Sequence, residues 1–240
     1  MRIFRSRRLA GVGGVAVAFF GRGPIPRPEP AILAGSLRAP TGTLLRTATA
    51  RQIHSNTCLA VTLEDDPGDG PVGTGDALVT SDRGIALGVA TADCLPVVVV
   101  DPLAPAVAVV HAGWRGTHAG VLSAALQKLM TRYNARPERM ILAIGPGARA
   151  CCYEVGPDVI GAFSEPTGAA PGEKPPIIRG RRGFHLDLVE ANRRQALSAG
   201  VPIGAIDDLG ICSICRVDDC HSHRRDGDAA GRMWLLAALI

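Results

Sequence analysis

Two apolar, β-branched runs near the middle of the chain give the clearest pattern in the sequence. Residues 97–100 are all valine, and residues 106–110 read Ala-Val-Ala-Val-Val. The segment between the runs, residues 101–105, includes an aspartate and two prolines. Because β-branched residues favour strands while proline and aspartate favour turns, this pattern predicts a β-hairpin.

A cysteine and a histidine flank this predicted hairpin. If its centre lies between Pro102 and Leu103, Cys94 lies opposite His111, with Cβ atoms about 4.5–5.5 Å apart. Two side chains at that distance can bind one metal ion. Pro96 weakens the prediction, because proline removes one hydrogen-bond donor from the ladder before the pairing reaches Cys94.

The rest of the chain shows less distinct patterns, grouped here by kind. Strands are predicted within residues 15–20, 47–61, 76–80 and 139–144, and further apolar runs occupy residues 206–211 and 233–240. Apolar positions at helical spacing predict helices over residues 117–133, 157–163 and 187–199. Glycine, proline and polar residues predict loops over residues 23–40, 64–75 and 165–183.

The first twenty residues allow two interpretations. Four arginines among the first eight residues precede an apolar stretch over residues 9–20, which resembles a secretory signal. No clear small-x-small cleavage site follows Phe20, and residues 15–20 equally fit a first buried strand, which we favour. No stretch has the length and apolarity of a transmembrane helix.

Composition narrows the class of protein. The chain has 240 residues, of which 47% are hydrophobic, enough for the packed core of one large domain or two small ones. The net charge of +4 is dispersed and only 4% of residues are aromatic, which argues against nucleic-acid binding. Seven cysteines, an odd number, favour metal or thiol chemistry in a reducing compartment over a disulfide framework.

An open catalytic zinc site commonly uses three protein ligands, so Cys94 and His111 need a third. His54 is the best candidate, because it follows Gln52 and Ile53 in a strand-like segment, whereas His118 and His185 lie in a predicted helix and loop. A plain surface histidine is the alternative interpretation of His54. A second cluster has a spacing compatible with a small structural zinc site and comprises Cys212, Cys215, Cys220, His221 and His223. Reduced thiols without a metal are the simpler interpretation of this cluster.

Arginines near both ends of this region are candidates for binding an anion. Arg115 precedes the helix predicted over residues 117–133, and a guanidinium beside a helix N-terminus is a credible phosphate site. Arg224 and Arg225 follow His223 and fit a clamp for phosphate or carboxylate, or alternatively a solvated surface.

Several short motifs together resemble one known family. They read QIH at 52–54, GDAL at 75–78, TADCLP at 91–96, HAGWRG at 111–116, CYEVG at 152–156 and SHRRDG at 222–227. In this order they are similar to the YfiH-like laccase-domain proteins, also called polyphenol oxidases and purine nucleoside phosphorylases. Two departures stand out: residues 21–51 match the family's usual opening poorly, and Cys220 and His221 replace aromatic residues before Ser222.

The resemblance implies a fold and a set of site residues. The fold is α+β, a four-layer α/β/β/α sandwich with mixed β-sheets, forming one domain over residues 1–240 in which residues 1–50 are atypical. The implied metal ligands are His54, Cys94 and His111, and the implied catalytic residues are Asp93, Cys94 and His111. Candidates for binding substrate or phosphate are Arg115, Glu154, His223, Arg224 and Arg225.

The resemblance also implies an activity, with alternatives. We expect zinc-dependent phosphorolysis of adenosine, inosine or methylthioadenosine, with adenosine deamination as a second activity, by a cytoplasmic monomer or homodimer. Its partners are then purine nucleosides and phosphate, without nucleic acid or a membrane. The alternatives are copper-dependent phenol oxidation, a cysteine hydrolase editing peptidoglycan precursors with Cys94 as nucleophile and His111 as base, and a metal-stabilised interaction domain.

Overall fold

The valine-rich hairpin lies at the centre of the larger of two stacked sheets. Strands β7 (Leu95–Asp101) and β8 (Ala106–Ala112) pair in antiparallel fashion, and every residue of both is buried. Val97 and Val99 face one hydrophobic core, while Val98 and Val100 face another. Both faces of these strands are covered, which explains why their sequences lack the alternation of a half-exposed strand.

The observed register corrects the predicted one. Pro96 pairs with His111, so the predicted pairing of Cys94 with His111 is wrong by two residues. The reason is the turn, residues 102–105, in which the carboxylate of Asp101 accepts two backbone N–H groups and moves the centre of the hairpin. Pro96 itself is part of β7 and does not interrupt the strand.

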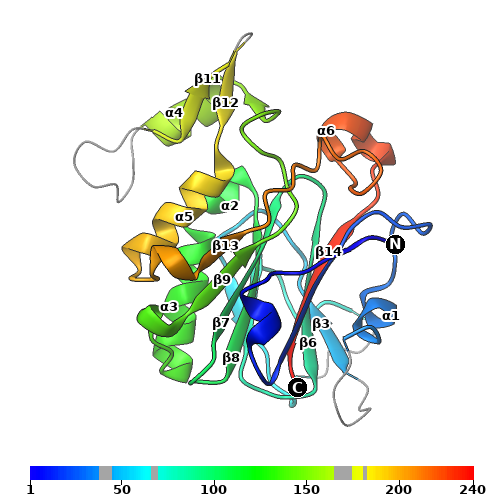
Figure 1. Cartoon of the computed structure of the whole chain (residues 1–240), viewed down its shortest axis with the longest axis vertical. Helices are drawn as coiled ribbons and strands as arrows, with labels where there is room; N and C mark the ends of the chain where they lie inside the picture. Colours follow the sequence, from blue (N-terminus) through cyan, green and yellow to red (C-terminus); the bar gives the residue numbers. More distant parts are fainter. Residues whose placement is uncertain (38–44, 66–69, 165–174, 181–182) are drawn as a thin grey trace.

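The structure is a computed structural model that describes residues 1–37, 45–65, 70–164, 175–180 and 183–240. The six-stranded sheet has the order β13-β9-β7-β8-β5-β4, the five-stranded sheet β1-β2-β14-β6-β3, and a small sheet β10-β12-β11 (Figure 1). The other strands are β1 (Ile3–Phe4), β2 (Val15–Phe20), β3 (Arg46–Thr49), β4 (Cys58–Ala60), β5 (Ala77–Thr80), β6 (Ile85–Thr91), β9 (Ile141–Ile144), β10 (Glu154–Val155), β11 (Ile177–Arg179), β12 (Phe184–Leu186), β13 (Ile206–Asp208) and β14 (Met233–Leu239). The helices are α1 (Pro30–Ala34), α2 (Trp114–His118), α3 (Val121–Tyr133), α4 (Pro157–Ser164), α5 (Leu188–Ser198) and α6 (His223–Asp226).

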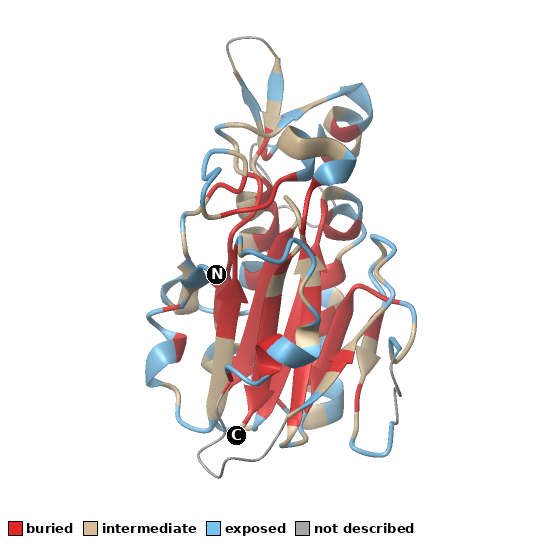
Figure 2. Ribbon diagram, turned by 90° about the vertical axis from the view of Figure 1, so that its right-hand side faces the viewer, coloured by how far each residue is buried: buried red, intermediate tan, exposed pale blue. Residues whose placement is uncertain are grey.

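Helices cover the outer faces of the two large sheets. Helices α3 and α5 pack on the six-stranded sheet, and α1 packs on the five-stranded sheet. Between the sheets lies a core that contains Phe19, Leu87 and Leu235, and Figure 2 shows the buried residues concentrated in the strands. Both sheets combine parallel and antiparallel pairs. The four-layer α/β/β/α sandwich with mixed sheets is therefore confirmed.

Two predicted elements are divided in the structure. Residues 47–61 form β3 and β4, which belong to different sheets, with a crossover between them. The helix predicted over residues 117–133 is split into α2 and α3, because Gly120 has a φ of 85° and interrupts the helical backbone. The helical spacing of apolar residues continues across Gly120, so this spacing alone does not reveal the break between the two helices.

The remaining predictions are mostly confirmed. Residues 15–20 form β2, as the strand interpretation of the N-terminal segment predicts. The loop expected over residues 23–40 contains α1, and the one expected over residues 165–183 contains β11. Residues 38–40, 66–69, 165–174 and 181–182 of the predicted loops lie outside the described residues. In the described part of the chain, no helix combines the length and apolarity needed to cross a membrane.

Asp101 makes the stability of this hairpin depend on pH. Burial alone would raise the pKa of its carboxyl group, but hydrogen bonds from Arg139, from the backbone N–H of Arg136 and from the turn lower it below the usual 3.8. A carboxyl group with a lowered folded-state pKa stabilises the fold above its unfolded pKa and loses that contribution as the pH falls.

We therefore expect Asp101→Asn to lower the free energy of unfolding at pH 7 by roughly 1–3 kcal/mol. The difference from wild type should shrink as the pH falls below about 4, where the native carboxylate also becomes protonated. Urea unfolding between pH 3 and pH 7 measures this. A difference that stays constant over the whole range would contradict the explanation.

Candidate metal centre

Three potential metal ligands converge at one end of the sheets. Cys94 directly precedes β7, His111 lies near the end of β8, and His54 lies in the crossover between β3 and β4. Their ligand atoms all lie within 4.8 Å of one another. The Cys94 Sγ is 3.8 Å from His54 Nε2, and the two imidazole rings meet edge to face with centroids 4.9 Å apart. The structure thus brings together the three residues that the sequence singled out, although the register that first paired two of them was wrong.

Asp76 organises this group and was missed as a site residue. It directly precedes β5, is completely buried, and accepts the Nδ1–H of His111 at 2.8 Å. It also accepts backbone N–H groups from Ile53, His54 and Ser55. The carboxylate therefore fixes both the ring of His111, leaving Nε2 free as a ligand, and the crossover that carries His54. A carboxylate at the start of an apolar strand was the signal in the sequence that could have revealed it.

Electrostatics favour a thiolate at Cys94. Burial alone would raise the pKa of this thiol, but the imidazoles of His111 and His54 outweigh burial and lower it to about 6. Burial alone would lower the pKa of His111, but the Cys94 thiolate and the Asp76 carboxylate raise it to about 9. Without a metal, Cys94 and His111 thus form a thiolate–imidazolium pair.

Unusual backbone conformations bring the site together. His54 and Asp93 have φ angles of 61° and 89°, in the left-handed region that non-glycine residues rarely adopt. Gly113 follows β8, and a Cβ atom there would lie 2.8 Å from both Cys94 Sγ and His54 Cδ2. The absence of a side chain at this position is therefore what allows the ligands to approach one another.

Substituting Gly113 tests this close approach. Gly113→Ala should weaken metal binding by roughly 10-fold or more, because the new methyl group must push Cys94 or His54 out of place. The backbone at Gly113 has a φ of −77°, which alanine adopts readily, so the protein should still fold. Competition with a fluorescent zinc chelator measures the affinity. Gly161→Ala, where a Cβ atom would meet nothing within 4 Å, is the control, and equal affinities in the two variants would contradict the prediction.

The three donors fit a metal ion chemically. A thiolate and two imidazoles are ligands suited to zinc or copper, and three protein ligands leave a coordination position open for a substrate or water. His118 and His185, which the sequence disfavoured as the third ligand, do not belong to this group. His118 packs against Phe163, and His185 donates to the carbonyl of Ala150. The donors are compatible with either ion.

Asp93 lies beside the metal ligands and accepts three hydrogen bonds from neighbouring donors. Its Oδ1 accepts the hydroxyl of Ser213 at 2.6 Å, and its Oδ2 accepts the hydroxyl of Ser222 and the backbone N–H of Arg224. Because Asp93 directly precedes Cys94, these hydrogen bonds join the segment that carries Cys94 to the connection between β13 and α6.

Two arginines and a tyrosine form the surroundings of the centre. Arg115 is exposed in α2, with its guanidinium 4.4 Å from the centroid of the Trp114 ring. Arg224 lies 5.3 Å from the centroid of Tyr153. Burial and the nearby Cys94 thiolate raise the pKa of Tyr153 to about 12, against the effects of both arginines. Arg115 lies two residues after Gly113, and the backbone N–H of Arg224 binds Asp93, so both arginines belong to segments that border the metal ligands.

Arg225 is placed differently from the prediction. Its Nε and Nη2 each donate one hydrogen bond to the carboxylate of Asp226. Its Nη1 donates to the carbonyls of Ser213 and Ile214. A further bond reaches the carbonyl of Cys220. Since all the N–H donors of this guanidinium have protein acceptors, the predicted contact with phosphate does not agree with the structure. Arg225 instead holds the loop that carries Ser213.

The other predicted binding residues, Glu154 and His223, are exposed. The backbone carbonyl of Glu154 accepts a hydrogen bond from Arg224 Nη1 at 2.7 Å. His223 begins α6, with Nε2 3.7 Å from a carboxylate oxygen of Asp228. Glu154 thus helps to orient Arg224 through its backbone carbonyl. The side chain of Glu154 takes no part in this hydrogen bond.

The second predicted metal cluster has a different membership. Cys220 and His221 are buried, and neither belongs to a group of potential metal ligands in the described part of the chain. Cys212 and Cys215 instead lie close to Cys151 and Cys152. Spacing along the sequence suggested the wrong partners, because the loop after β9 brings the adjacent cysteines to this position.

Comparison with known proteins agrees with this arrangement. A family model described as multi-copper polyphenol oxidoreductase laccase matches residues 32–240. The chain belongs to this laccase-like, YfiH-type family. Two solved structures of the family are similar in fold: YlmD from Geobacillus stearothermophilus, with 28% identity and a TM-score of 0.80, and YfiH from Bacillus licheniformis, with 26% identity and a TM-score of 0.81. These similarities cover 95% and 94% of the present chain, respectively, and 93% of each solved chain.

Curated members of the laccase-like family carry names of purine enzymes. A purine nucleoside phosphorylase of Deinococcus radiodurans is 42% identical over 166 residues, which is 69% of this chain and 61% of the relative. An adenosine deaminase, RL5, from an unknown prokaryotic organism is 42% identical over 159 residues, which is 65% of this chain and 59% of the relative. The matched part of the chain thus spans about three fifths of these relatives.

Proposed function

We propose that the chain is a zinc-dependent purine nucleoside phosphorylase that acts on adenosine, inosine or methylthioadenosine and also deaminates adenosine. The observation that carries the proposal is the open group of His54, Cys94 and His111, with Arg115 and Arg224 in the segments that border it. The names of the relatives support the same class of substrate. When bound, zinc would supply Lewis-acid chemistry and lower the pKa of a coordinated water to about 7.

The phosphate is proposed to bind at the arginines. Among the described residues, the Arg115 guanidinium contacts the Trp114 ring but has no protein acceptor, so its N–H groups are free for an anion. Arg224 uses one Nη1 hydrogen bond for the carbonyl of Glu154 and stacks over Tyr153. In phosphorolysis a phosphate oxygen attacks C1′ of the ribose, the bond from C1′ to N9 breaks, and the base leaves with the electron pair. Free base and ribose 1-phosphate are the products.

Deamination would use the same site with water in place of phosphate. Water adds at C6 of the purine and ammonia leaves, which requires a group that moves a proton between them. Asp93 is the candidate carrier, and its hydrogen bonds to Ser213 and Ser222 offer a route by which a proton can be exchanged. Tyr153, with a pKa raised to about 12, remains a neutral hydrogen-bond donor near neutral pH.

A cysteine hydrolase is the second candidate, favoured by one observation. The thiolate at Cys94 beside the imidazolium of His111 is also the arrangement of an activated thiol nucleophile. Such an enzyme forms an acyl intermediate on Cys94, whereas the metal proposal leaves this thiolate as a ligand. For a multi-copper oxidase the support is weaker, because only one group of potential ligands in the described residues contains histidine.

The proposal is tested by incubating zinc-loaded protein with adenosine, with and without phosphate. Chromatography should show inosine without phosphate, and adenine, ribose 1-phosphate and hypoxanthine, formed from inosine, only when phosphate is present. Absence of every product from protein that has bound zinc would overturn the proposal. An acyl adduct on Cys94 after incubation with amide substrates would favour the hydrolase instead.

Arg115 separates the two proposed reactions. Arg115→Ala should raise the KM for phosphate by roughly 10-fold or more, because a charge-assisted contact contributes about 1.5–3 kcal/mol. The deamination of adenosine, which needs no phosphate, should change far less. Arg132→Ala removes an arginine that is also stacked on an adjacent aromatic residue, Tyr133, and serves as the control. Equal losses of both activities in Arg115→Ala would contradict a role in phosphate binding.

A further inference from the structure

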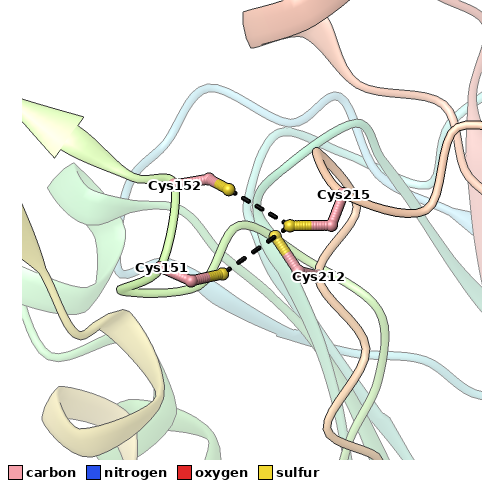
Figure 3. Close-up of side chains that lie close together, drawn as sticks. All are labelled: Cys151, Cys152, Cys212 and Cys215. Carbon is pink, nitrogen blue, oxygen red and sulfur yellow. Dashed lines mark hydrogen bonds between the residues drawn. The ribbon is translucent and has the colours of Figure 1, made fainter.

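Four cysteines from two distant segments meet outside the site described above. Cys151 and Cys152 lie in the loop between β9 and β10, and Cys212 and Cys215 lie in the loop after β13. Their Sγ atoms all lie within 4.8 Å of one another. Figure 3 shows the four side chains directed toward a common point. All four are free thiols.

The spacing of these sulfur atoms suits one tetrahedral ion. With Zn–S bonds of about 2.3 Å, a tetrahedron places its sulfur atoms about 3.8 Å apart. The Cys215 Sγ is 3.8 Å from that of Cys151 and 3.1 Å from that of Cys152.

Backbone groups surround one of the sulfurs in the manner expected for a bound thiolate. Burial alone would raise the pKa of the Cys212 thiol, but the nearby backbone N–H groups of Cys215, Arg149 and Ile214 lower it. Two of these donors belong to the Cys-x-x-Cys turn itself, which therefore wraps around its first sulfur. Such N–H groups stabilise a negatively charged sulfur without displacing it from a metal.

The two segments are held together independently of the sulfurs. Gly147 and Cys212 form an isolated parallel bridge, in which Gly147 donates to the carbonyl of Ile211 and accepts from Ser213. The guanidinium of Arg149 binds the carboxylate of Asp208 and the carbonyls of Gly145 and Ile211. The loops are thus already aligned when the metal arrives. These contacts also occupy the nearby arginine, so it does not serve as the cation for the thiolates.

We propose that Cys151, Cys152, Cys212 and Cys215 form a second metal site, which binds one zinc ion in tetrathiolate coordination. Each thiol that becomes a ligand releases its proton to solvent. Four protein ligands fill a tetrahedral zinc ion and leave no position for a substrate, so the site is structural. It is distinct from the three-ligand group, since the two share no residue.

The proposed ion would clamp loops that reach the candidate metal centre. Ser213 lies between two of the ligands and donates to Asp93, while Tyr153 directly follows Cys152 and faces Arg224. One ion across residues 151–215 would therefore hold both neighbours of the three-ligand group in position. Its removal should disturb the surroundings of that group without removing any of its ligands.

Cobalt(II) binding to a Cys94→Ser variant tests the proposal without altering the four cysteines. This variant lacks the thiolate of the three-ligand site, so any thiolate–cobalt absorption must come from another group. We expect the intense visible bands of tetrahedral thiolate coordination in the reduced protein, and their loss in the double variant Cys94→Ser/Cys215→Ser. A folded, reduced Cys94→Ser protein that shows no such bands would overturn the proposal.

Zinc content provides the second measurement. Wild-type protein purified with a reductant should lose one ion per chain on Cys215→Ser and a different one on Cys94→Ser, as elemental analysis by mass spectrometry would detect. Cys58→Ala, which removes a buried thiol outside both groups, is the control and should retain both ions. A disulfide between Cys152 and Cys215 that persists in reductant and excludes zinc, found by peptide mass mapping, would also overturn the proposal.

Discussion

Replacing Cys94 by serine is expected to abolish metal binding at the three-ligand site and, with it, both proposed activities. A hydroxyl is a poor substitute for a thiolate whose pKa has been lowered to about 6 by two imidazoles. The affinity for zinc should therefore fall by more than roughly 100-fold, beyond what changes around a metal ligand cause. Chelator competition measures the affinity, and adenosine turnover measures the activity.

The result distinguishes the two candidate roles of Cys94. Loss of turnover together with zinc at the three-ligand site supports ligation, whereas loss of turnover with full retention of zinc would support a nucleophile. Cys58→Ser, a substitution of a buried cysteine on β4 outside the metal groups, controls for general damage to the fold. Full turnover without zinc at this site would contradict the metal-dependent mechanism.

Asp76→Asn is expected to have the second largest effect. An amide replaces one accepting oxygen by an NH2 group, which must face either the Nδ1–H of His111 and the backbone N–H of His54, or the backbone N–H groups of Ile53 and Ser55. One buried donor pair is then left unsatisfied, at roughly 1–3 kcal/mol of stability. The ring of His111 also loses its anchor, so zinc affinity should fall about 10- to 100-fold.

Thermal unfolding and chelator competition together test this expectation. Asp82→Asn is a suitable control, because Asp82 likewise accepts a backbone N–H, that of Leu63, but lies away from the metal ligands. The control should retain wild-type affinity for zinc. If Asp76→Asn loses stability but binds zinc normally, Asp76 supports only the fold and does not orient His111.

How far the fold could be predicted depends on the range of the interactions involved. The valine-rich runs identified β7 and β8, because strands that are buried on both faces consist of consecutive apolar residues. The register was not predictable from those runs, since it depends on how the carboxylate of Asp101 closes the turn. The shape of a four-residue turn is a local geometric detail that a pattern of apolar residues does not contain.

The candidate site shows the same limit more strongly. Cys94 and His111 are brought together by one hairpin, so local reasoning found both. His54 reaches them from a crossover between two sheets, so its context made it only the best candidate, and the resemblance to a known family supported that choice. Arg225 carries the charge expected of a phosphate ligand, but its carbonyl acceptors belong to a loop whose course no local pattern reveals. Residue type indicates what a side chain can do, and the fold decides what it is free to do.

The left-handed backbone at His54 and Asp93 has a consequence for engineering this protein. Such conformations cost of the order of 1–3 kcal/mol each for residues other than glycine, and both residues lie at the candidate centre. A selection for thermostability alone would therefore favour glycine at these two positions, because glycine adopts a positive φ without strain. The variants recovered would be more robust proteins that lack a ligand or its neighbour, so such a selection must be coupled to retention of the metal.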